Sequence, residues 1–207
     1  PFISICEARP EHRSLSATRS AIVKSRQGVE LITSGELIVV DADDNEVPAD
    51  GETMGEIIAR GNVVMKGYYN DEEATNKVLV NGWFHTGDMA VVHPDGYVEI
   101  KDRIKDIIIS GGENISSVEL ESILLSHPSV KEAAIVGVPN EKWGQSPHAF
   151  VVLRQGHSVT EADLKSFVGQ HLASFKKPKW ISFVAELPKT TTGKIQKYVL
   201  RSGRANI

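Results

Sequence analysis

The pattern of apolar residues changes shortly after Lys101, and this change constrains the fold more than any other feature of the sequence. Before it, short apolar runs such as residues 35–41 and 55–61 are separated by turns rich in Asp, Asn, Pro and Gly, a pattern typical of strands. After it, short apolar runs alternate with segments of helical periodicity. We therefore predict an α+β fold, with a β-rich unit over residues 1–102 and a small α+β domain over residues 103–207 that has a central sheet and flanking helices.

The first half predicts few helices. Residues 88–93 and 97–101 flank a Pro-Asp-Gly turn, which is typical of a β-hairpin. Asp71 precedes two Glu residues and favours the start of a short helix that reaches Leu79. Residues 11–30 are polar and charged with no sustained period, so we interpret them as a surface loop with at most one helical turn.

The second half predicts strands and helices in alternation. The predicted strands cover residues 106–110, 130–138, 148–153 and 180–187, and the predicted helices cover residues 116–126, a segment that opens at 160–163, and 195–201. Ser116 or Ser117 suits the first helix as its N-cap, and Val118 and Leu124 are among its apolar positions. The second helix carries apolar residues at helical spacing, namely Leu164, Phe167, Val168 and Leu172.

Composition and charge narrow the class of protein. The chain is 41% hydrophobic and 24% charged, as in ordinary globular proteins, and its formal net charge of −4 argues against a general nucleic-acid binder. We find no apolar run long enough for an integral membrane segment and no signal-peptide pattern, and residues 204–207 are not a peroxisomal address, so we predict a cytoplasmic protein. The seven histidines show no metal-ligand spacing, and we predict no metal site.

The N-terminal residues suggest two further expectations. The single cysteine, Cys6, cannot form an internal disulfide, and its apolar neighbours favour a small core residue over the alternative, a reactive thiol. The sequence opens on Pro1 within an apolar run and without an initiator methionine, which we interpret as the start of a fragment.

Two segments carry residues suited to holding a ligand. In residues 82–88 (GWFHTGD), Asp88 is expected to be exposed at the start of a strand, where its carboxylate could accept both hydroxyls of a sugar diol; an ordinary turn is the alternative. In residues 101–114 (KDRIKDIIISGGEN), Arg103 could face the same ligand, and the pair Gly111-Gly112 lets the backbone approach a ligand closely. The alternative for this segment is a solvated charge cluster and a β-turn.

A third segment, residues 187–197 (LPKTTTGKIQK), places Lys194 at the end of a loop that we expect to be flexible. A lysine is a compact charge on a long stem, which suits contact with a carboxylate or phosphate oxygen. A surface lysine at a helix start is the alternative. The segment lacks the spacing of a phosphate-binding P-loop, so we reject that interpretation.

The order and spacing of four segments resemble the core motifs of the adenylate-forming enzymes, which include acyl-CoA synthetases, luciferases and peptide-synthetase adenylation domains. The segments are residues 53–75 (TMGEIIARGNVVMKGYYNDEEAT), 82–88, 101–121 (KDRIKDIIISGGENISSVELE) and 187–194 (LPKTTTGK). The resemblance extends over nearly the whole chain from about residue 28. Residues 111–121 and 139–153 (PNEKWGQSPHAFVVL) resemble acyl-CoA synthetases of medium- or long-chain fatty acids or related carboxylates.

The resemblance implies the C-terminal fragment of an acyl-CoA synthetase: the end of a large N-terminal domain, a hinge near residues 102–105, and a mobile C-terminal domain. The implied reaction joins a carboxylic acid to the α-phosphate of ATP, and the CoA thiol then displaces AMP. Mg²⁺ would be bound mainly through the upstream domain and the phosphates. Because the family places its phosphate loop, adenine contacts and acyl pocket upstream, we expect this chain alone to be inactive. The oligomeric state stays open, a homo-oligomer included.

The resemblance also implies a role for single residues. Lys194 matches the catalytic lysine between the carboxylate and the α-phosphate. Asp88 matches the aspartate that binds the ribose, Arg103 an arginine that holds the nucleotide, and Lys105 the hinge. The implied CoA contacts are Gly111, Gly112, Glu113, Trp143, Phe175 and Lys177, with Lys176 beside them.

Two alternatives stay open. The chain could belong to an adenylation enzyme that loads a carrier protein, or to a luciferase-like member, and the acceptor of the acyl group distinguishes these. It could also be a non-catalytic binding module of the same fold. The presence of Asp88, Arg103 and Lys194 together argues against the last, because a binding module does not need all three.

Overall fold

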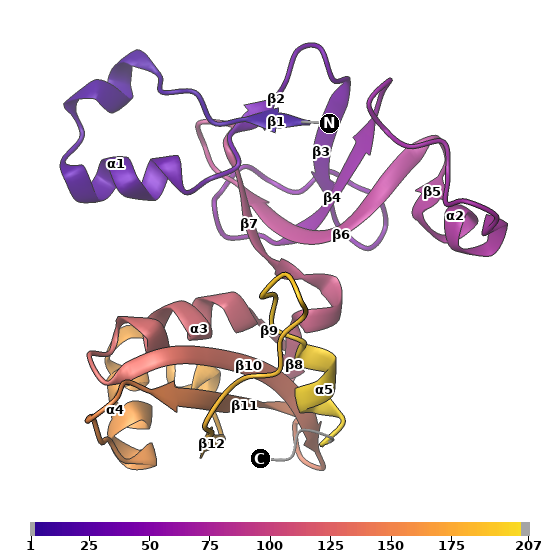
Figure 1. Ribbon diagram of the computed structural model, residues 1–207. Helices are drawn as coiled ribbons and strands as arrows, with labels where there is room; N and C mark the ends of the chain where they lie inside the picture. The colour runs from indigo at the N-terminus through magenta and orange to yellow at the C-terminus, as the bar shows by residue number, and fades with distance from the viewer. Residues whose placement is uncertain (1–2, 204–207) are drawn as a thin grey trace. The chain divides into compact units, whose positions relative to one another are not determined.

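The computed structural model describes residues 3–203, and the chain divides between Lys105 and Asp106 into two compact units (Figure 1). The mixed α+β fold class is confirmed. The role of residues 102–105 as a hinge stays a prediction. No helix within residues 3–203 is long and apolar enough to cross a bilayer. Residues 204–207, on which the expectation about a peroxisomal address depends, lie outside the described part.

The first unit contains a five-stranded antiparallel sheet in the order β3-β4-β6-β5, with β7 paired to β6. The strands are β3 (Glu36–Val40), β4 (Gly55–Arg60), β5 (Leu79–Val80), β6 (Trp83–Val92) and β7 (Val98–Arg103). The β6–β7 hairpin confirms the predicted one, and it closes where Gly96 donates to the carbonyl of His93 at 2.7 Å. β6 is longer than predicted, since it begins at Trp83.

Side chains that point to one face of these strands form the core of the first unit. Val39, Ile57, Ala90 and Val98 are all at most 5% exposed and form one cluster. Side chains two residues apart point to the same face of a strand, so each strand contributes to this cluster from one face only. Helix α2 (Glu72–Val78) begins as predicted, because the Asp71 carboxylate accepts from the amide of Ala74.

The prediction of a loop over residues 11–30 is wrong. This segment contains a 3-10 helix (η1, Pro10–Ser14), helix α1 (Ala17–Lys24) and strand β2 (Val29–Glu30), which pairs with β1 (Ser4–Ile5). Helix α1 buries none of its residues, so its sequence has no apolar period to reveal it; its cap is Ser16, whose hydroxyl accepts from Arg19.

Cys6 is not a core residue as predicted. It is half-buried, and its thiol donates to the carbonyl of Val23 at 3.4 Å. The short strand β1 therefore brings this side chain against the end of α1 rather than into the apolar cluster of the sheet.

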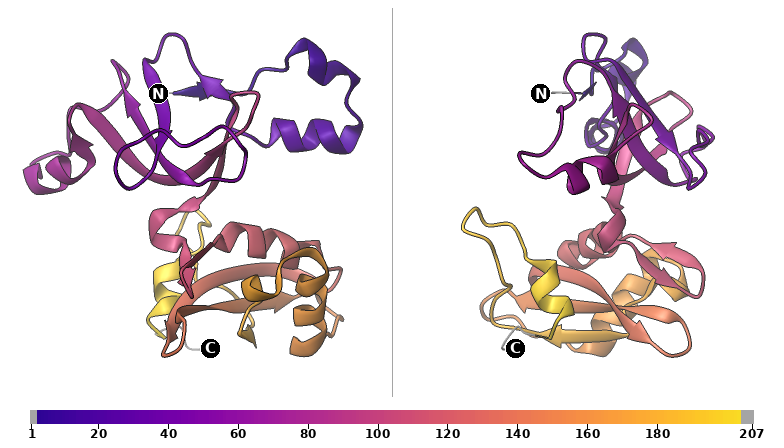
Figure 2. Two further views of the ribbon diagram at one scale, coloured as in Figure 1. Left: turned by 180° about the vertical axis from the view of Figure 1, so that it is seen from behind. Right: turned by 90° about the vertical axis from the view of Figure 1, so that its right-hand side faces the viewer.

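The second unit contains a second sheet, which Figure 2 shows from two further sides. Its five strands are arranged in the order β10-β11-β8-β9, with β12 paired to β11. The strands are β8 (Ile108–Ser110), β9 (Glu113–Ile115), β10 (Val130–Asn140), β11 (Gly144–Leu153) and β12 (Trp180–Phe183). All pairs are antiparallel except β11–β12. The helices are α3 (Ser117–Ser126), α4 (Glu161–His171) and α5 (Lys197–Arg201).

The hairpin β10–β11 is buried on both faces. Ala133, Ile135, Ala149 and Val151 belong to a cluster that also holds residues of α3 and α4. Their sequence neighbours Ala134, Val136, Phe150 and Val152 belong to a second cluster with Leu187 and with Leu200 of α5. Because side chains alternate between the faces, α3 and α4 cover one face of this sheet and α5 the other. This explains why both strands are almost continuously apolar.

The structure corrects several element boundaries in the second unit. β10 and β11 extend to Asn140 and from Gly144, so a short turn joins them, and β12 ends at Phe183 rather than at residue 187. β9 was not predicted, because its residues lack an apolar pattern and it forms only by folding back on β8. Val118, one of the apolar positions named for α3, is 44% exposed, whereas Leu124 is fully buried.

The cap predicted for α3 is confirmed, and α4 begins where the sequence predicted it. The Ser116 hydroxyl accepts from the amide of Glu119 at 3.1 Å, which starts α3. Thr160 and Asp163 form a reciprocal capping box at the start of α4. These contacts span three residues and therefore depend on local sequence alone.

Neighbouring leucines of α3 provide a test of the core. Leu124 is fully buried and Leu125 is 44% exposed. Leu124→Ala is expected to lower the free energy of unfolding of the second unit by about 2–5 kcal/mol, since it leaves a cavity. Leu125→Ala should change it by no more than about 0.5 kcal/mol. Urea denaturation of both variants measures the difference, and equal losses would contradict the assigned packing of α3.

Candidate functional site

Asp88 and Arg103 lie side by side on β6 and β7. They are register partners, and Nε of Arg103 lies 2.6 Å from Oδ1 of Asp88. Arg103 also donates from a terminal nitrogen to the carbonyl of Thr86 at 3.2 Å. The structure therefore brings together the two residues predicted to hold a nucleotide.

The expected exposure and position of Asp88 are corrected. Its side chain is only 21% exposed, because Arg103 covers it, and it lies well inside β6 rather than at a strand start. On β4, Glu56 pairs with Met89 and Ile58 with His85, so residues 86–88 of β6 stand opposite Ile57 alone. This bulge, in which Gly87 has a φ of 72°, sets Asp88 apart from the regular ladder.

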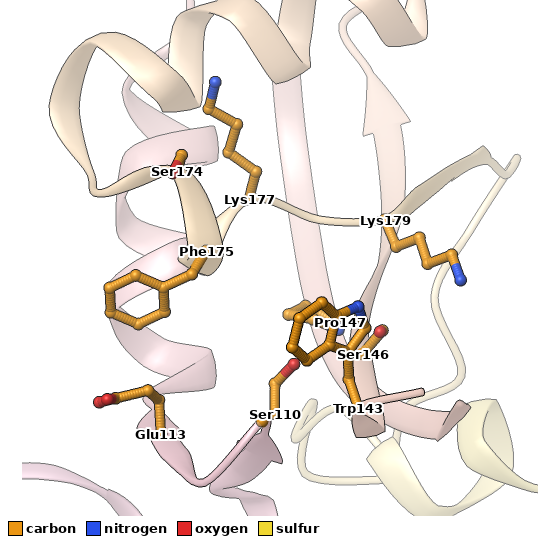
Figure 3. A pocket seen from close by; sticks show the side chains of 10 residues that line it. Ser110, Glu113, Trp143, Ser146, Pro147, Ser174, Phe175, Lys177 and Lys179 are labelled. Carbon is orange, nitrogen blue, oxygen red and sulfur yellow. The ribbon is translucent and has the colours of Figure 1, made fainter. Parts of the chain in front are cut away.

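A pocket of about 390 Å³ lies on the second unit (Figure 3). It is lined by Ser110, Gly111, Glu113, Trp143, Ser146, Pro147, Ser174, Phe175, Lys177 and Lys179. Five of the six predicted CoA contacts are in this set, and the sixth, Gly112, lies in the turn beside it. The side chains come from separate stretches of the sequence, so the fold assembles the pocket.

The turns that precede β9 and β11 form one wall of this pocket. Gly111 and Gly112 have φ angles of 62° and 88°, which L side chains rarely adopt, and they fold β9 back on β8. The amide of Gly111 donates to the carbonyl of Trp143 at 2.9 Å. A Cβ at Gly111 would lie 2.9 Å from the indole ring of Trp143, so the ring needs glycine at this position.

The pocket combines aromatic surface with positive charge. Trp143 and Phe175 are 48% and 49% exposed, and Figure 3 shows their rings on different sides of the pocket. The ammonium groups of Lys177 and Lys179 point away from these rings in Figure 3, and that of Lys142 lies 4.7 Å from the centroid of the Trp143 ring. Such a surface can stack on a planar ring while the surrounding lysines meet anionic groups.

Lys176 and Lys177 differ in what they contact. Lys176 pairs with Glu119 of α3 at 2.7 Å and does not line the pocket. Lys177 lines the pocket and lies along α4, where a Cβ at Gly169 would come within 2.4 Å of its Cε. Of the two lysines, Lys177 is therefore the better placed to meet a ligand.

Lys194 follows a turn rather than the flexible loop that we expected. Thr190 donates its amide to the carbonyl of Lys194 at 2.8 Å, Gly193 donates to Thr190 at 2.9 Å, and Lys194 donates to the Thr190 hydroxyl at 3.1 Å. Lys194 itself is exposed, and within residues 3–203 its ammonium has no ion-pair partner. Its neighbours Lys189 and Lys197, by contrast, pair with Glu132 and Glu121.

Comparison with known proteins identifies the family. Residues 119–194 match the model of the AMP-binding enzyme C-terminal domain. A probable CoA ligase of Humulus lupulus is 52% identical over 200 residues, which are 95% of this chain and 36% of that protein. The chain belongs to the adenylate-forming superfamily. It matches the C-terminal portion of its acyl-CoA ligases and spans about a third of their length.

Other CoA ligases and synthetases are similar to this chain over most of its length. The peroxisomal trans-cinnamate:CoA ligase of Petunia hybrida is 48% identical over 95% of this chain and 35% of its own length. Among solved structures, ATP-bound MatB of Rhodopseudomonas palustris is 35% identical with a TM-score of 0.80, covering 88% of this chain and 36% of its own. The o-succinylbenzoate CoA synthetase of Bacillus subtilis, in complex with its acyl-adenylate, is 35% identical with a TM-score of 0.79, covering 93% and 38%.

Sequence reasoning missed the ionic contacts that hold helix α5. Lys197 lies 2.7 Å from Glu121 and donates to the Ser117 hydroxyl at 2.6 Å, and Glu121 also accepts from the amide of Ile135. Arg201 pairs with Asp106 at the start of the second unit. These partners are far apart in the chain, and no local pattern could have revealed them. Together they fix the helix that follows Lys194.

Among residues 3–203 no group of three or more His, Cys, Asp and Glu residues could hold a metal ion. His148 of β11 is partly buried. The centroid of its ring lies 4.3 Å from that of Phe150, on which it stacks, and its Nε2 lies 2.9 Å from the Ser182 hydroxyl. Burial lowers the pKa of His148 from its ordinary value of 6.5, and the charge of Glu161 opposes this only in part.

The depressed pKa of His148 predicts a pH dependence of stability. The folded protein takes up this proton less readily than the unfolded chain, so the free energy of unfolding of the second unit should fall as the pH drops below about 6.5. Urea denaturation at about pH 7.5 and about pH 5.5 measures the change. His148→Gln should reduce it, and His157→Gln, at an exposed histidine, should not. An unchanged pH dependence in His148→Gln would refute the assignment.

Proposed function

We propose that this chain is the C-terminal part of an AMP-forming acyl-CoA ligase, which activates a carboxylic acid with ATP and transfers the acyl group to CoA. The observation that carries the proposal is the exposed Lys194, which lies on a hydrogen-bonded turn and has no ion-pair partner among residues 3–203. The chain that carries it is related to CoA ligases over 95% of its length. A lysine without a partner keeps its charge available for an anionic substrate.

In the first half-reaction, a carboxylate oxygen attacks the α-phosphorus of ATP and pyrophosphate leaves. Lys194 would neutralise the negative charge that the carboxylate and the α-phosphate bring together. Asp88 would accept both ribose hydroxyls, while Arg103 orients that carboxylate and faces the nucleotide. Mg²⁺ would offset the charge of the phosphates. Its ligands would come mainly from the phosphates and from the domain upstream of this chain.

In the second half-reaction, the CoA thiol attacks the acyl carbonyl and AMP leaves. The pocket in Figure 3 supports this step, because Trp143 or Phe175 could stack on the adenine of CoA, and Lys177 or Lys179 could meet its phosphates. The turn at Gly111 and Gly112 would leave room for the pantetheine chain beside Glu113. A rotation about Lys105 between the two half-reactions completes the proposal.

The substrate is proposed to be a monocarboxylic acid. The names of relatives specify cinnamate in Petunia hybrida, and acetate or butyrate in Arabidopsis thaliana, so the expectation of a medium- or long-chain acid stays a prediction. Both of these relatives are described as peroxisomal. The cytoplasmic localisation of this chain likewise stays a prediction, as does the inactivity of the chain alone.

Replacing Lys194 in the complete ligase tests the first half-reaction. Lys194→Ala is expected to slow acyl-adenylate formation by at least about a hundredfold, because a preorganised charge contact is lost. ATP–pyrophosphate exchange measures this step. Thioester formation from supplied acyl-adenylate should suffer much less. Lys131→Ala, at an exposed lysine of the same unit, is the control. Equal damage to both half-reactions would rule out the role assigned to Lys194.

Replacing Trp143 tests the CoA pocket in the same enzyme. Trp143→Ala is expected to raise the KM for CoA about tenfold through loss of stacking, with adenylate formation unchanged. Phe183→Ala removes a comparably exposed ring outside the pocket and should leave the KM for CoA unaltered. Steady-state kinetics at varied CoA concentration measures the KM for CoA. An unaltered KM in Trp143→Ala would contradict the proposal that this pocket binds CoA.

A further inference from the structure

We propose that Glu56 is a positioning residue for the nucleotide site, one that holds the peptide preceding Asp88 so that the Asp88 carboxylate meets both ribose hydroxyls. The inference rests on the proposed function of Asp88 as the ribose-binding residue. It comes from the bulge in β6, whose geometry depends on a side chain of the neighbouring strand.

The bulge interrupts the ladder between β4 and β6. Residues 86–88 have only Ile57 opposite them, so Gly87 has no register partner on β4. The hydroxyl of Thr86 donates to the carbonyl of Ile57 at 2.7 Å and accepts from the amide of Asp88 at 3.1 Å. These two contacts fix the outer residues of the bulge and leave the central peptide to be held by something else.

The Glu56 carboxylate holds that central peptide. Its Oε1 accepts from the amide of Gly87 at 2.8 Å, and its Oε2 lies 2.8 Å from Nδ1 of His85. The side chains of Glu56 and His85 are only 19% and 20% exposed, so water competes little for either contact. One carboxylate thus replaces a missing backbone acceptor and ties the residues on both sides of Thr86 to β4.

This arrangement matters because of the chemistry of a diol. A carboxylate that accepts two hydroxyls must present both oxygens in a fixed plane, and a small rotation of its backbone loses one of the two bonds. The Asp88 carboxylate is fixed from the side by Arg103, at 2.6 Å. Its backbone pairs with β7 on one side, and on the side of β4 it is positioned by the bulge. Loss of the Glu56 carboxylate would free the Gly87 peptide, which glycine allows to turn widely.

Discrimination between ATP and 2′,3′-dideoxy-ATP by the complete ligase tests this role, because a merely structural residue would not alter it. Dissociation constants are measured by calorimetry. The unsubstituted enzyme should prefer ATP by at least about tenfold, the value expected for hydrogen bonds to a charged group. Glu56→Ala should lose most of this preference. Glu56→Gln should keep most of it, since the amide oxygen still accepts from Gly87.

Two further variants keep the test decisive. Glu56→Asp retains the charge, but its shorter side chain withdraws the carboxylate from the Gly87 amide, so it should lose the preference for ATP as Glu56→Ala does. If Glu56→Ala does not fold, the comparison of Glu56→Asp with Glu56→Gln decides the question. Glu36→Ala removes an exposed glutamate of the same sheet, paired with Arg60, and should match the unsubstituted enzyme.

Asp88→Ala separates failure of this inference from failure of the proposed function. If Asp88→Ala keeps the full preference for ATP, the ribose-binding role of Asp88 is wrong and the proposed function fails with it. If Asp88→Ala abolishes the preference while Glu56→Ala and Glu56→Asp retain it, the proposed function stands and the positioning role of Glu56 is overturned.

Discussion

The two-sided burial of the β10–β11 hairpin is the constraint on which the rest of the second unit depends. Ile135 faces the cluster with α3 and α4, and the next residue, Val136, faces the cluster with α5. A shift of register by one residue would exchange these faces and place each helix against the wrong side chains. The same register sets the turn that carries Trp143, and the second cluster sets α5 and therefore the turn before it. The pocket and the turn before α5 thus derive their positions from one hairpin.

Three lysines that lie close together in the sequence differ in their carboxylate partners. Lys197 is largely buried against Glu121, and a buried pair of this kind contributes more to a unique arrangement than to net stability, because desolvation offsets much of the attraction. Lys189 pairs with Glu132, whose pKa this contact lowers. Lys194 alone of the three has no carboxylate partner in the described part of the chain. The fold thus pairs two of these charges with carboxylates and leaves the third exposed.

Local signals made part of this structure predictable. The caps at Asp71 and Ser116 were predictable because each contact spans three residues. The motif segments identified the family for the same reason, since each is a short continuous stretch. Helix α1 was missed because it buries nothing, and β9 because its partner β8, not its own sequence, makes it a strand.

Contacts between distant residues were not predictable. Glu56 and His85 are separated by 29 positions, and Lys197 and Ser117 by 80. Each of these side chains would suit a solvated surface if the sequence alone were considered. Only the register of β4 with β6 gives Glu56 its place beside the bulge, and only the packing of α5 gives Lys197 its partners. The residues that support a site are therefore harder to find than the residues that touch its ligand.

The contacts around Lys105 reduce the number of residues that are expected to act as the hinge. Arg103 is held within the first unit by Asp88, and Asp106 is held within the second unit by Arg201. Between them, Ile104 is 47% exposed, and Ile104 and Lys105 belong to a short 3-10 helix (η2, Ile104–Asp106). Each unit has a buried core of its own. If the enzyme rotates its domains, the change in backbone angles is expected at Ile104 and Lys105, because their neighbours on both sides are anchored to opposite units.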